Sequence, residues 1–88
     1  MRLQFKASFE RDLKRVKDKE LLKEVRRVIE EIESAETIHG IGHLRKLRAE
    51  GSYFRVRLGD YRMGLIVEED LATFVRFLHR SEIYRYFP

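Results

Sequence analysis

Residues 53–67 read Tyr53-Phe54-Arg55-Val56-Arg57-Leu58-Gly59-Asp60-Tyr61-Arg62-Met63-Gly64-Leu65-Ile66-Val67. Apolar and polar side chains alternate before and after Gly59-Asp60, a pattern typical of two strands joined by a turn. Because side chains alternate between the faces of a strand, Arg55 and Arg57 share one face while the apolar residues between them share the other. The stretch therefore predicts an antiparallel hairpin with an apolar face and a face that carries Arg55, Arg57 and Arg62.

Downstream of this hairpin, Glu68-Glu69-Asp70 reads as a second turn. Residues 71–78 follow as a third strand, and its apolar side chains on both faces indicate a position inside the sheet. Residues 79–88 are compatible either with one helical turn or with an extended tail.

Upstream, the alternation over residues 2–6 predicts a short opening strand that points Leu3 and Phe5 the same way. Ser8 is the expected N-cap of a first helix, and Asp18 that of a second helix over about residues 19–34. The second helix has a continuous apolar stripe, with charged residues at its other positions. Residues 35–43 contain two glycines and show no periodicity, so they form a connection.

This order of elements, a strand, two helices and then a meander of strands, predicts an α+β fold. We expect one domain over residues 1–88, because a chain of 88 residues leaves room for one core. Its N-terminal strand and two-helix hairpin would pack on one face of a mainly antiparallel sheet of about four strands. Two helices can cover only one face, so the arginine face must meet water or a partner.

Composition narrows the class of protein further. The chain has no cysteine, which excludes a disulfide framework and a thiolate metal site. The core of so small a domain leaves no room for a deep cofactor cavity, so we expect no cofactor. No apolar run is long enough for a membrane span or a signal peptide, so we expect a cytoplasmic protein without membrane contact. Residues 44–66 hold six basic and two acidic side chains, which accounts for the net charge of +4.

Three guanidinium groups on one sheet face can bind phosphate, because each supplies fixed donors without requiring a particular base. Arg55, Arg57 and Arg62 are therefore the first candidate site. The alternative is ordinary solubilising charge, with Glu50 or Asp60 as counter-ions. The basic surface could be extended by further candidate RNA-binding residues, namely Arg45, Lys46, Arg48 and Tyr53.

The tail supplies the remaining candidates, His79, Arg80 and Tyr84. Histidine is the side chain that exchanges protons near neutral pH, although single histidines and tyrosines are more often structural. His39 and His43 are four residues apart, but no carboxylate is spaced to complete a zinc site and the nearby glycines argue against a helix. We therefore expect no metal site.

Taken together, the run Tyr53–Arg62 and the closing His79-Arg80-Ser81-Glu82-Ile83-Tyr84-Arg85 resemble the RelE branch of the RelE/ParE toxin superfamily of prokaryotic toxin–antitoxin systems. The resemblance rests on an R-x-R-x-G-D-Y-R-like hairpin and an H-R-x-x-[IV]-Y-like tail, and the order of elements extends it over nearly the whole chain.

This resemblance implies a ribosome-dependent endoribonuclease that cuts mRNA in the ribosomal decoding site, among ribosomal RNA, without a metal, and is silenced by a cognate antitoxin protein. By position, Arg62 matches the arginine that holds the phosphate, and Arg55 and Arg57 match basic residues beside the scissile group. Tyr84 matches a tail tyrosine proposed as a base or a stacking residue. Arg80 lies near the tail arginine of the family.

The chain departs from the best-known branch, which has lysines where this chain has Arg55 and Arg57. Arginine is too basic to release a proton readily, so Arg57 is expected to act electrostatically and His79 is a candidate for proton transfer. Two alternatives stay open. The ParE-like arm of the superfamily shares the fold but inhibits DNA gyrase, and a ribosome- or RNA-binding module would perform no chemistry.

Overall fold

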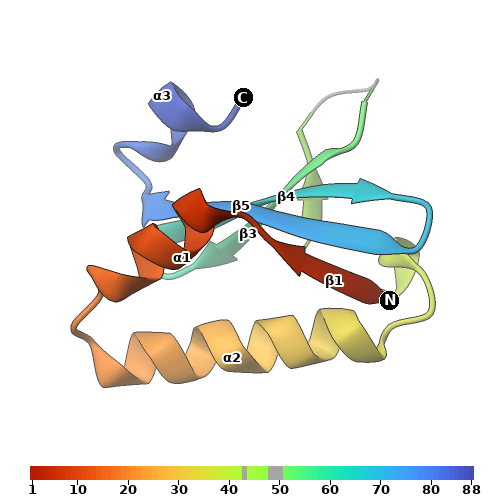
Figure 1. Cartoon of the computed structure of the whole chain (residues 1–88), viewed down its shortest axis with the longest axis horizontal. Helices are drawn as coiled ribbons and strands as arrows, with labels where there is room; N and C mark the ends of the chain where they lie inside the picture. Colours follow the sequence, from red (N-terminus) through yellow and green to blue (C-terminus); the bar gives the residue numbers. More distant parts are fainter. Residues whose placement is uncertain (43, 48–50) are drawn as a thin grey trace.

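The computed structural model describes residues 1–42, 44–47 and 51–88. Its single sheet has the strand order β1-β5-β4-β3-β2 and, except for the parallel pair β1–β5, is antiparallel (Figure 1). The elements are β1 (Arg2–Phe5), α1 (Ala7–Lys14), α2 (Lys19–Ser34), the 3-10 turn η1 (Ile38–Gly40), β2 (Leu44–Lys46), β3 (Tyr53–Leu58), β4 (Tyr61–Glu68), β5 (Leu71–His79) and α3 (Ile83–Tyr86).

The expected α+β class is confirmed, and the sheet has one strand more than the four expected. The additional strand is β2, whose three residues are too few to show an alternating pattern. The β3–β4 hairpin has the expected register, with Arg57 opposite Arg62. Its turn depends on Gly59, which has a φ of 60°, a left-handed conformation that costs other residues free energy.

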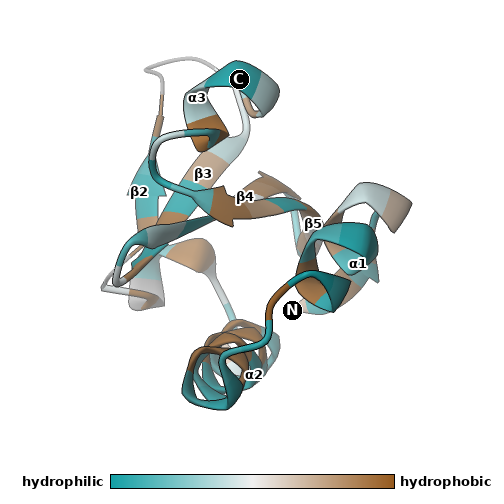
Figure 2. Cartoon of the chain, turned by 90° about the vertical axis from the view of Figure 1, so that its left-hand side faces the viewer, coloured by the Kyte–Doolittle hydropathy of each residue, from teal (hydrophilic) through white to brown (hydrophobic). Residues whose placement is uncertain are grey.

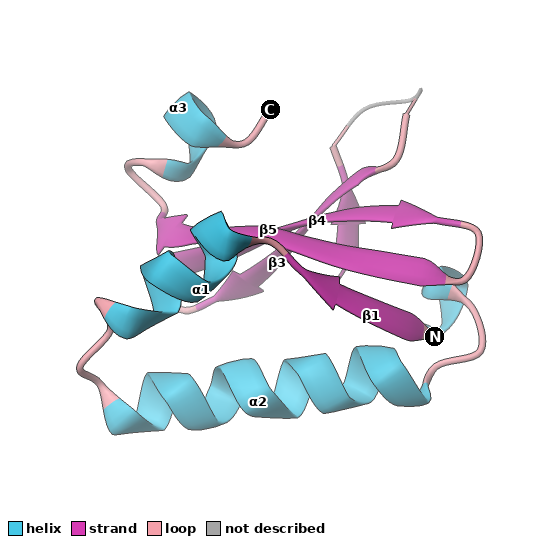
Figure 3. Cartoon of the chain, viewed as in Figure 1, coloured by secondary structure: helices cyan, strands magenta, loops and turns pink. Residues whose placement is uncertain are grey.

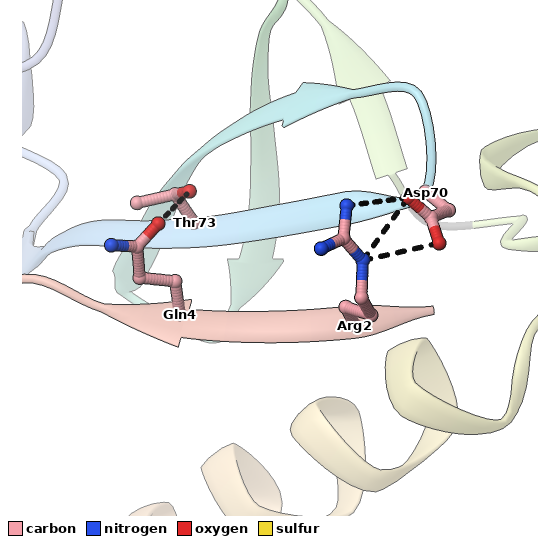
Figure 4. Close-up of polar contacts among 4 residues, drawn as sticks. All are labelled: Arg2, Gln4, Asp70 and Thr73. Carbon is pink, nitrogen blue, oxygen red and sulfur yellow. Dashed lines mark hydrogen bonds and ion pairs between the residues drawn. The ribbon is translucent and has the colours of Figure 1, made fainter.

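Strand β1 is an edge strand and lies next to β5, the last strand in the sequence. Its backbone lies parallel to β5, with Arg2 opposite Leu71 and Phe5 opposite Phe74. Side chains reinforce the pairing, as Figure 4 shows: Arg2 forms an ion pair of 2.8 Å with Asp70, and the Thr73 hydroxyl donates to Gln4 at 3.4 Å. The N-terminal strand is thereby tied to β5, the last strand in the sequence.

The core lies between the sheet and α2. Asp18 caps this helix as expected, because its carboxylate accepts from the backbone N–H groups of Glu20 and Leu21. The apolar residues of α2 gather on the side that faces the sheet (Figure 2), where Val28 and Ile32 are fully buried. Opposite them, the sheet contributes buried side chains, which are Val56, Leu58, Met63, Leu65, Val67, Ala72, Phe74 and Phe77.

Helix α1 covers the edge of β5 beyond the end of β1 (Figure 3). The prediction that Ser8 caps this helix is wrong, because α1 begins at Ala7 after Lys6, and the Ser8 hydroxyl donates to the Val75 carbonyl at 2.6 Å. Asp12 pairs with another backbone group of the same edge, since its carboxylate accepts a hydrogen bond from the Phe77 N–H at 2.9 Å. Polar side chains of α1 thus replace the missing neighbour strand.

Strand β5 contains a bulge where it pairs with β4. Gly64 pairs with Arg76 and the next residue, Leu65, pairs with Phe74, so Val75 is left without a cross-strand partner. One extra residue reverses the alternation of side chains, because the period of a strand is two. Phe74 and Phe77 therefore both face the core, while Arg76 points to the opposite face.

The opposite face of the sheet is partly covered by the C-terminal segment, contrary to the expectation that helices would leave it bare. Residues 83–86 form the helical turn α3, which was one of the two expected alternatives, and Figure 1 shows α3 and α2 on opposite sides of the sheet. Ile83 and Phe87 are buried there. In the described part of the chain, no helix is long and apolar enough to cross a membrane.

Candidate functional site

On the face opposite α2, side chains from three strands and α3 line a cavity of about 260 Å³, which we call the basic hollow. Its lining residues are Arg45, Arg55, Arg57, Arg62 and Tyr84. The three arginines expected from the hairpin are thus together, and two further sequence-predicted residues, Arg45 and Tyr84, join them.

The pairing of the strands explains why these arginines meet. Arg57 and Arg62 are direct cross-strand partners, and so are Arg45 and Arg55. Cross-strand partners on one face have Cβ atoms about 5 Å apart, so the guanidinium groups can reach one common anion. Like charges at this spacing repel each other, and an anion in the hollow would relieve the repulsion.

Arg62 is the most restrained member of the basic hollow. Its Nη1 donates to the carbonyl oxygens of Gly59 and Tyr61, both at 2.8 Å, so the β3–β4 turn holds the side chain. Burial, followed by the charges of Arg57 and Arg55, lowers the pKa of Arg62 from its ordinary value. A cation that is fixed in place and repelled by its neighbours is suited to bind a phosphate oxygen.

Tyr84 closes one side of the hollow. The Cζ atom of Arg55 lies 4.8 Å from the centre of the Tyr84 ring, a cation–π contact. The Tyr84 side chain is otherwise exposed, so its ring and hydroxyl are accessible to a ligand.

The side chains that line the basic hollow have the chemistry to recognise a phosphodiester. Of the residues that the structure describes, none with a carboxylate lines it. Guanidinium groups donate to phosphate oxygens in pairs, and an aromatic ring can stack on a nucleobase. The arrangement therefore suits the backbone of a single-stranded nucleic acid.

Two tail candidates lie outside the hollow. His79 is the cross-strand partner of Tyr61, contacts its ring edge to face and shares its Nδ1 with the Ser81 hydroxyl at 2.8 Å. This position is on the face of the sheet that α2 covers, because the bulge has reversed the alternation. Arg80 is exposed and turned toward Asp60 at 3.8 Å, although its charge still reaches Arg62.

Two candidate RNA-binding residues also differ from the expectation. Lys46 pairs with Phe54 on the other face of β2, away from Arg45. Tyr53 shares the face of Arg55, but its ring packs edge to face on Phe87 and supports the C-terminal segment. Arg48, His43 and Glu50 lie outside the described residues. His39 is exposed at η1.

Sequence reasoning missed Gly64 and Arg76, which lie on the same face as the basic hollow and contact the C-terminal segment. A signal was present for Gly64, because an isolated glycine inside a strand often marks a close approach by another group. For Arg76 there was none, since regular alternation after Phe74 places it in the core.

Comparisons with known proteins match nearly the whole chain. The model of the family described as ParE toxin of type II toxin-antitoxin system, parDE, matches residues 3–84. Toxin RelE3 of Methanocaldococcus jannaschii is 35% identical over 89 residues, which covers 100% of both chains.

Two solved structures have a similar fold. The crystal structure of a RelB-RelE antitoxin-toxin complex from Methanococcus jannaschii matches with a TM-score of 0.80 and 34% identity, covering 97% of this chain and 99% of that one. The structure of YafQ from Escherichia coli shares the fold, with a TM-score of 0.65 at 18% identity, covering 96% of this chain and 99% of that one.

Proposed function

Because the chain belongs to the RelE/ParE superfamily of type II toxin–antitoxin toxins, we propose that it is a ribosome-dependent endoribonuclease that cleaves mRNA without a metal. The observation that supports this proposal is the basic hollow, where four arginines and Tyr84 surround a space of about 260 Å³. Binding of mRNA in the ribosomal decoding site, next to ribosomal RNA, would place one phosphodiester there.

In the proposed reaction, the 2′-OH of the RNA attacks the neighbouring phosphorus, and the 5′-oxygen of the next nucleotide leaves. The products are a 2′,3′-cyclic phosphate and a 5′-hydroxyl end. Negative charge grows on the phosphate oxygens during the attack, so donors that are already in place stabilise the transition state more than the ground state. We assign this role to Arg57 and Arg62, and Arg45 and Arg55 hold the flanking backbone.

Proton transfer needs a group other than arginine, which is too basic to release a proton readily. We propose that Tyr84, which lines the hollow, accepts the proton of the 2′-OH in its phenolate form. The phenol so formed returns this proton through water to the 5′-oxygen as it leaves, which gives the 5′-hydroxyl end and restores the phenolate. The Tyr84 ring stacks on a neighbouring base. His79 has no part in this assignment, because it lies on the other face of the sheet.

We also propose that a cognate antitoxin inhibits the protein by covering the basic hollow. The Methanococcus jannaschii relative was solved as a RelB-RelE antitoxin-toxin complex. A segment with acidic and apolar residues would neutralise the arginines, and we expect it to be disordered when alone. Excess antitoxin should abolish cleavage, and a complex that stays fully active would contradict this assignment.

The test of the nuclease is cleavage in a translation extract, followed by mapping of mRNA 5′ ends. Wild-type protein should produce cuts inside codons, and Arg62→Gln should lower the cleavage rate by about 100-fold or more. Arg26→Gln on the exposed side of α2 is the matched control, because the same chemical change there should leave cleavage unaltered.

The second candidate function is inhibition of DNA gyrase, because the matched family model is described as a ParE toxin. Intact mRNA together with inhibited supercoiling would favour that function over the nuclease. Intact mRNA with salt-dependent ribosome binding that weakens in Arg62→Gln would instead indicate a module that binds RNA without chemistry.

A further inference from the structure

A row of directly paired residues crosses the sheet under the C-terminal segment. Arg55 of β3 is opposite Gly64 of β4, and Gly64 is opposite Arg76 of β5. The bulge at Val75 brings Arg76 to this face. Two arginines therefore flank a glycine on the side of the sheet that carries the basic hollow.

The C-terminal segment sits on this row. The ring of Phe87 lies directly over Gly64, so that a Cβ atom added there would come within 2.6 Å of the ring carbons. Real Cβ atoms do not approach carbon so closely, which means that only glycine lets Phe87 reach the strand. Phe87 is buried as a result, together with Ile83 one turn earlier.

The two tyrosines of α3 contact the two arginines of the row. Arg55 Cζ lies 4.8 Å from the centre of the Tyr84 ring, and Arg76 Cζ lies 5.0 Å from that of Tyr86. Arg76 is itself held by the buried carboxylate of Asp12, to which its Nε and Nη2 donate at 2.8 and 3.0 Å. Tyr86 is thus linked through Arg76 to helix α1.

Helix α3 has four residues, and one helical turn is not stable alone. Its position is therefore set by these tertiary contacts. We propose that Gly64, Arg76 and Tyr86 are positioning residues that seat α3 and thereby hold Tyr84 in the basic hollow. This proposal rests on the proposed function for its effect on cleavage, whereas the seating itself can be measured without RNA.

The first test compares Gly64→Ala with Gly42→Ala. The added methyl group displaces Phe87 in the first variant and meets nothing within 4 Å in the second. We expect Gly64→Ala to lose the nuclear Overhauser contacts between the Tyr84 ring and the Arg55 side chain. Its kcat for cleavage should fall about 100-fold, as for Tyr84→Ala, while KM changes little because the arginines still bind RNA. Gly42→Ala should behave as wild type.

A second pair of variants excludes general unfolding as the explanation. Tyr86 is 54% exposed, so its replacement cannot open the core. Tyr86→Leu removes the contact with Arg76 and should lower kcat about two- to fivefold, with weaker Tyr84–Arg55 contacts, whereas Tyr86→Phe keeps the ring and should restore both.

Retention of the Tyr84–Arg55 contacts in folded Gly64→Ala, or equal behaviour of the two Tyr86 variants, would overturn the proposal. If wild-type protein cleaves no RNA but the contacts change as expected, the seating is supported and the proposed nuclease fails. The two conclusions are therefore separable.

Discussion

The structure predicts a large loss of stability for the substitution Asp12→Ala. The Asp12 side chain is buried, with a relative exposure of 4% for the residue. It accepts two hydrogen bonds from Arg76 and one from the Phe77 N–H. Alanine would leave a guanidinium charge and a backbone donor without this partner, away from water.

The magnitude follows from those two losses. Removal of one member of a buried ion pair costs about 3–5 kcal/mol, and an unsatisfied buried N–H costs about 1–3 kcal/mol. The Arg76 side chain keeps 20% exposure and can regain some water, so we expect a loss of about 4 kcal/mol. A domain of this length has a total stability of about 4–13 kcal/mol, so the loss is a large share of it.

The assay is urea unfolding followed by circular dichroism, together with thermal melting. A loss of about 4 kcal/mol lowers Tm by roughly 15–30 °C in a domain of this size. Asp18→Ala is the matched control, because it removes a carboxylate that is exposed and loses only two N-cap hydrogen bonds, at a cost of about 1 kcal/mol.

Equal losses in the two variants would refute the reasoning. A double variant, Asp12→Ala with Arg76→Met, checks the cause. Because it removes the orphaned charge together with its partner, it should be more stable than Asp12→Ala alone.

Three further predictions concern the turn, the N-terminal ion pair and the basic hollow. Gly59→Ala should lower the free energy of unfolding, measured in urea, by about 1 kcal/mol, because residue 59 has a φ of 60°. Gly59→Asn should lower it by less, and equal losses would contradict a backbone cause. The hydrogen bond from Arg2 lowers the pKa of Asp70 below its usual 3.8, so this stabilisation is present above that value and is lost as pH falls through the lowered pKa. Arg2→Gln should therefore reduce the fall of Tm with decreasing pH in the acidic range. An unchanged fall would mean that the Arg2–Asp70 ion pair does not contribute to stability. Inorganic phosphate at ten times its Kd should stabilise the wild type by about 1.4 kcal/mol, with a smaller Tm shift in Arg57→Gln; equal shifts would place the anion elsewhere.

Local sequence patterns were sufficient to predict the fold class and part of the candidate site. Alternation over residues 53–67 identifies the β3–β4 hairpin and its arginine face, because the period of a strand decides which side chains share a face. The stripe of α2 and the cap at Asp18 follow in the same way from helical geometry. Arg55, Arg57 and Arg62 were therefore recognisable as one cluster from their spacing and the intervening turn.

The sequence by itself thus determined four of the strands (β1, β3, β4 and β5), the helices α1 and α2 and the three hairpin arginines, since these depend on neighbours along the chain. Tertiary structure decided the rest of the site. Pairing of the short strand β2 added Arg45, and the approach of Phe87 to Gly64 brought Tyr84 to Arg55. The bulge at Val75 places His79 on the side of the sheet that faces α2, because one unpaired residue reverses the facing of every later side chain in the strand. The position of such a residue is known only from the pairing with the neighbouring strand.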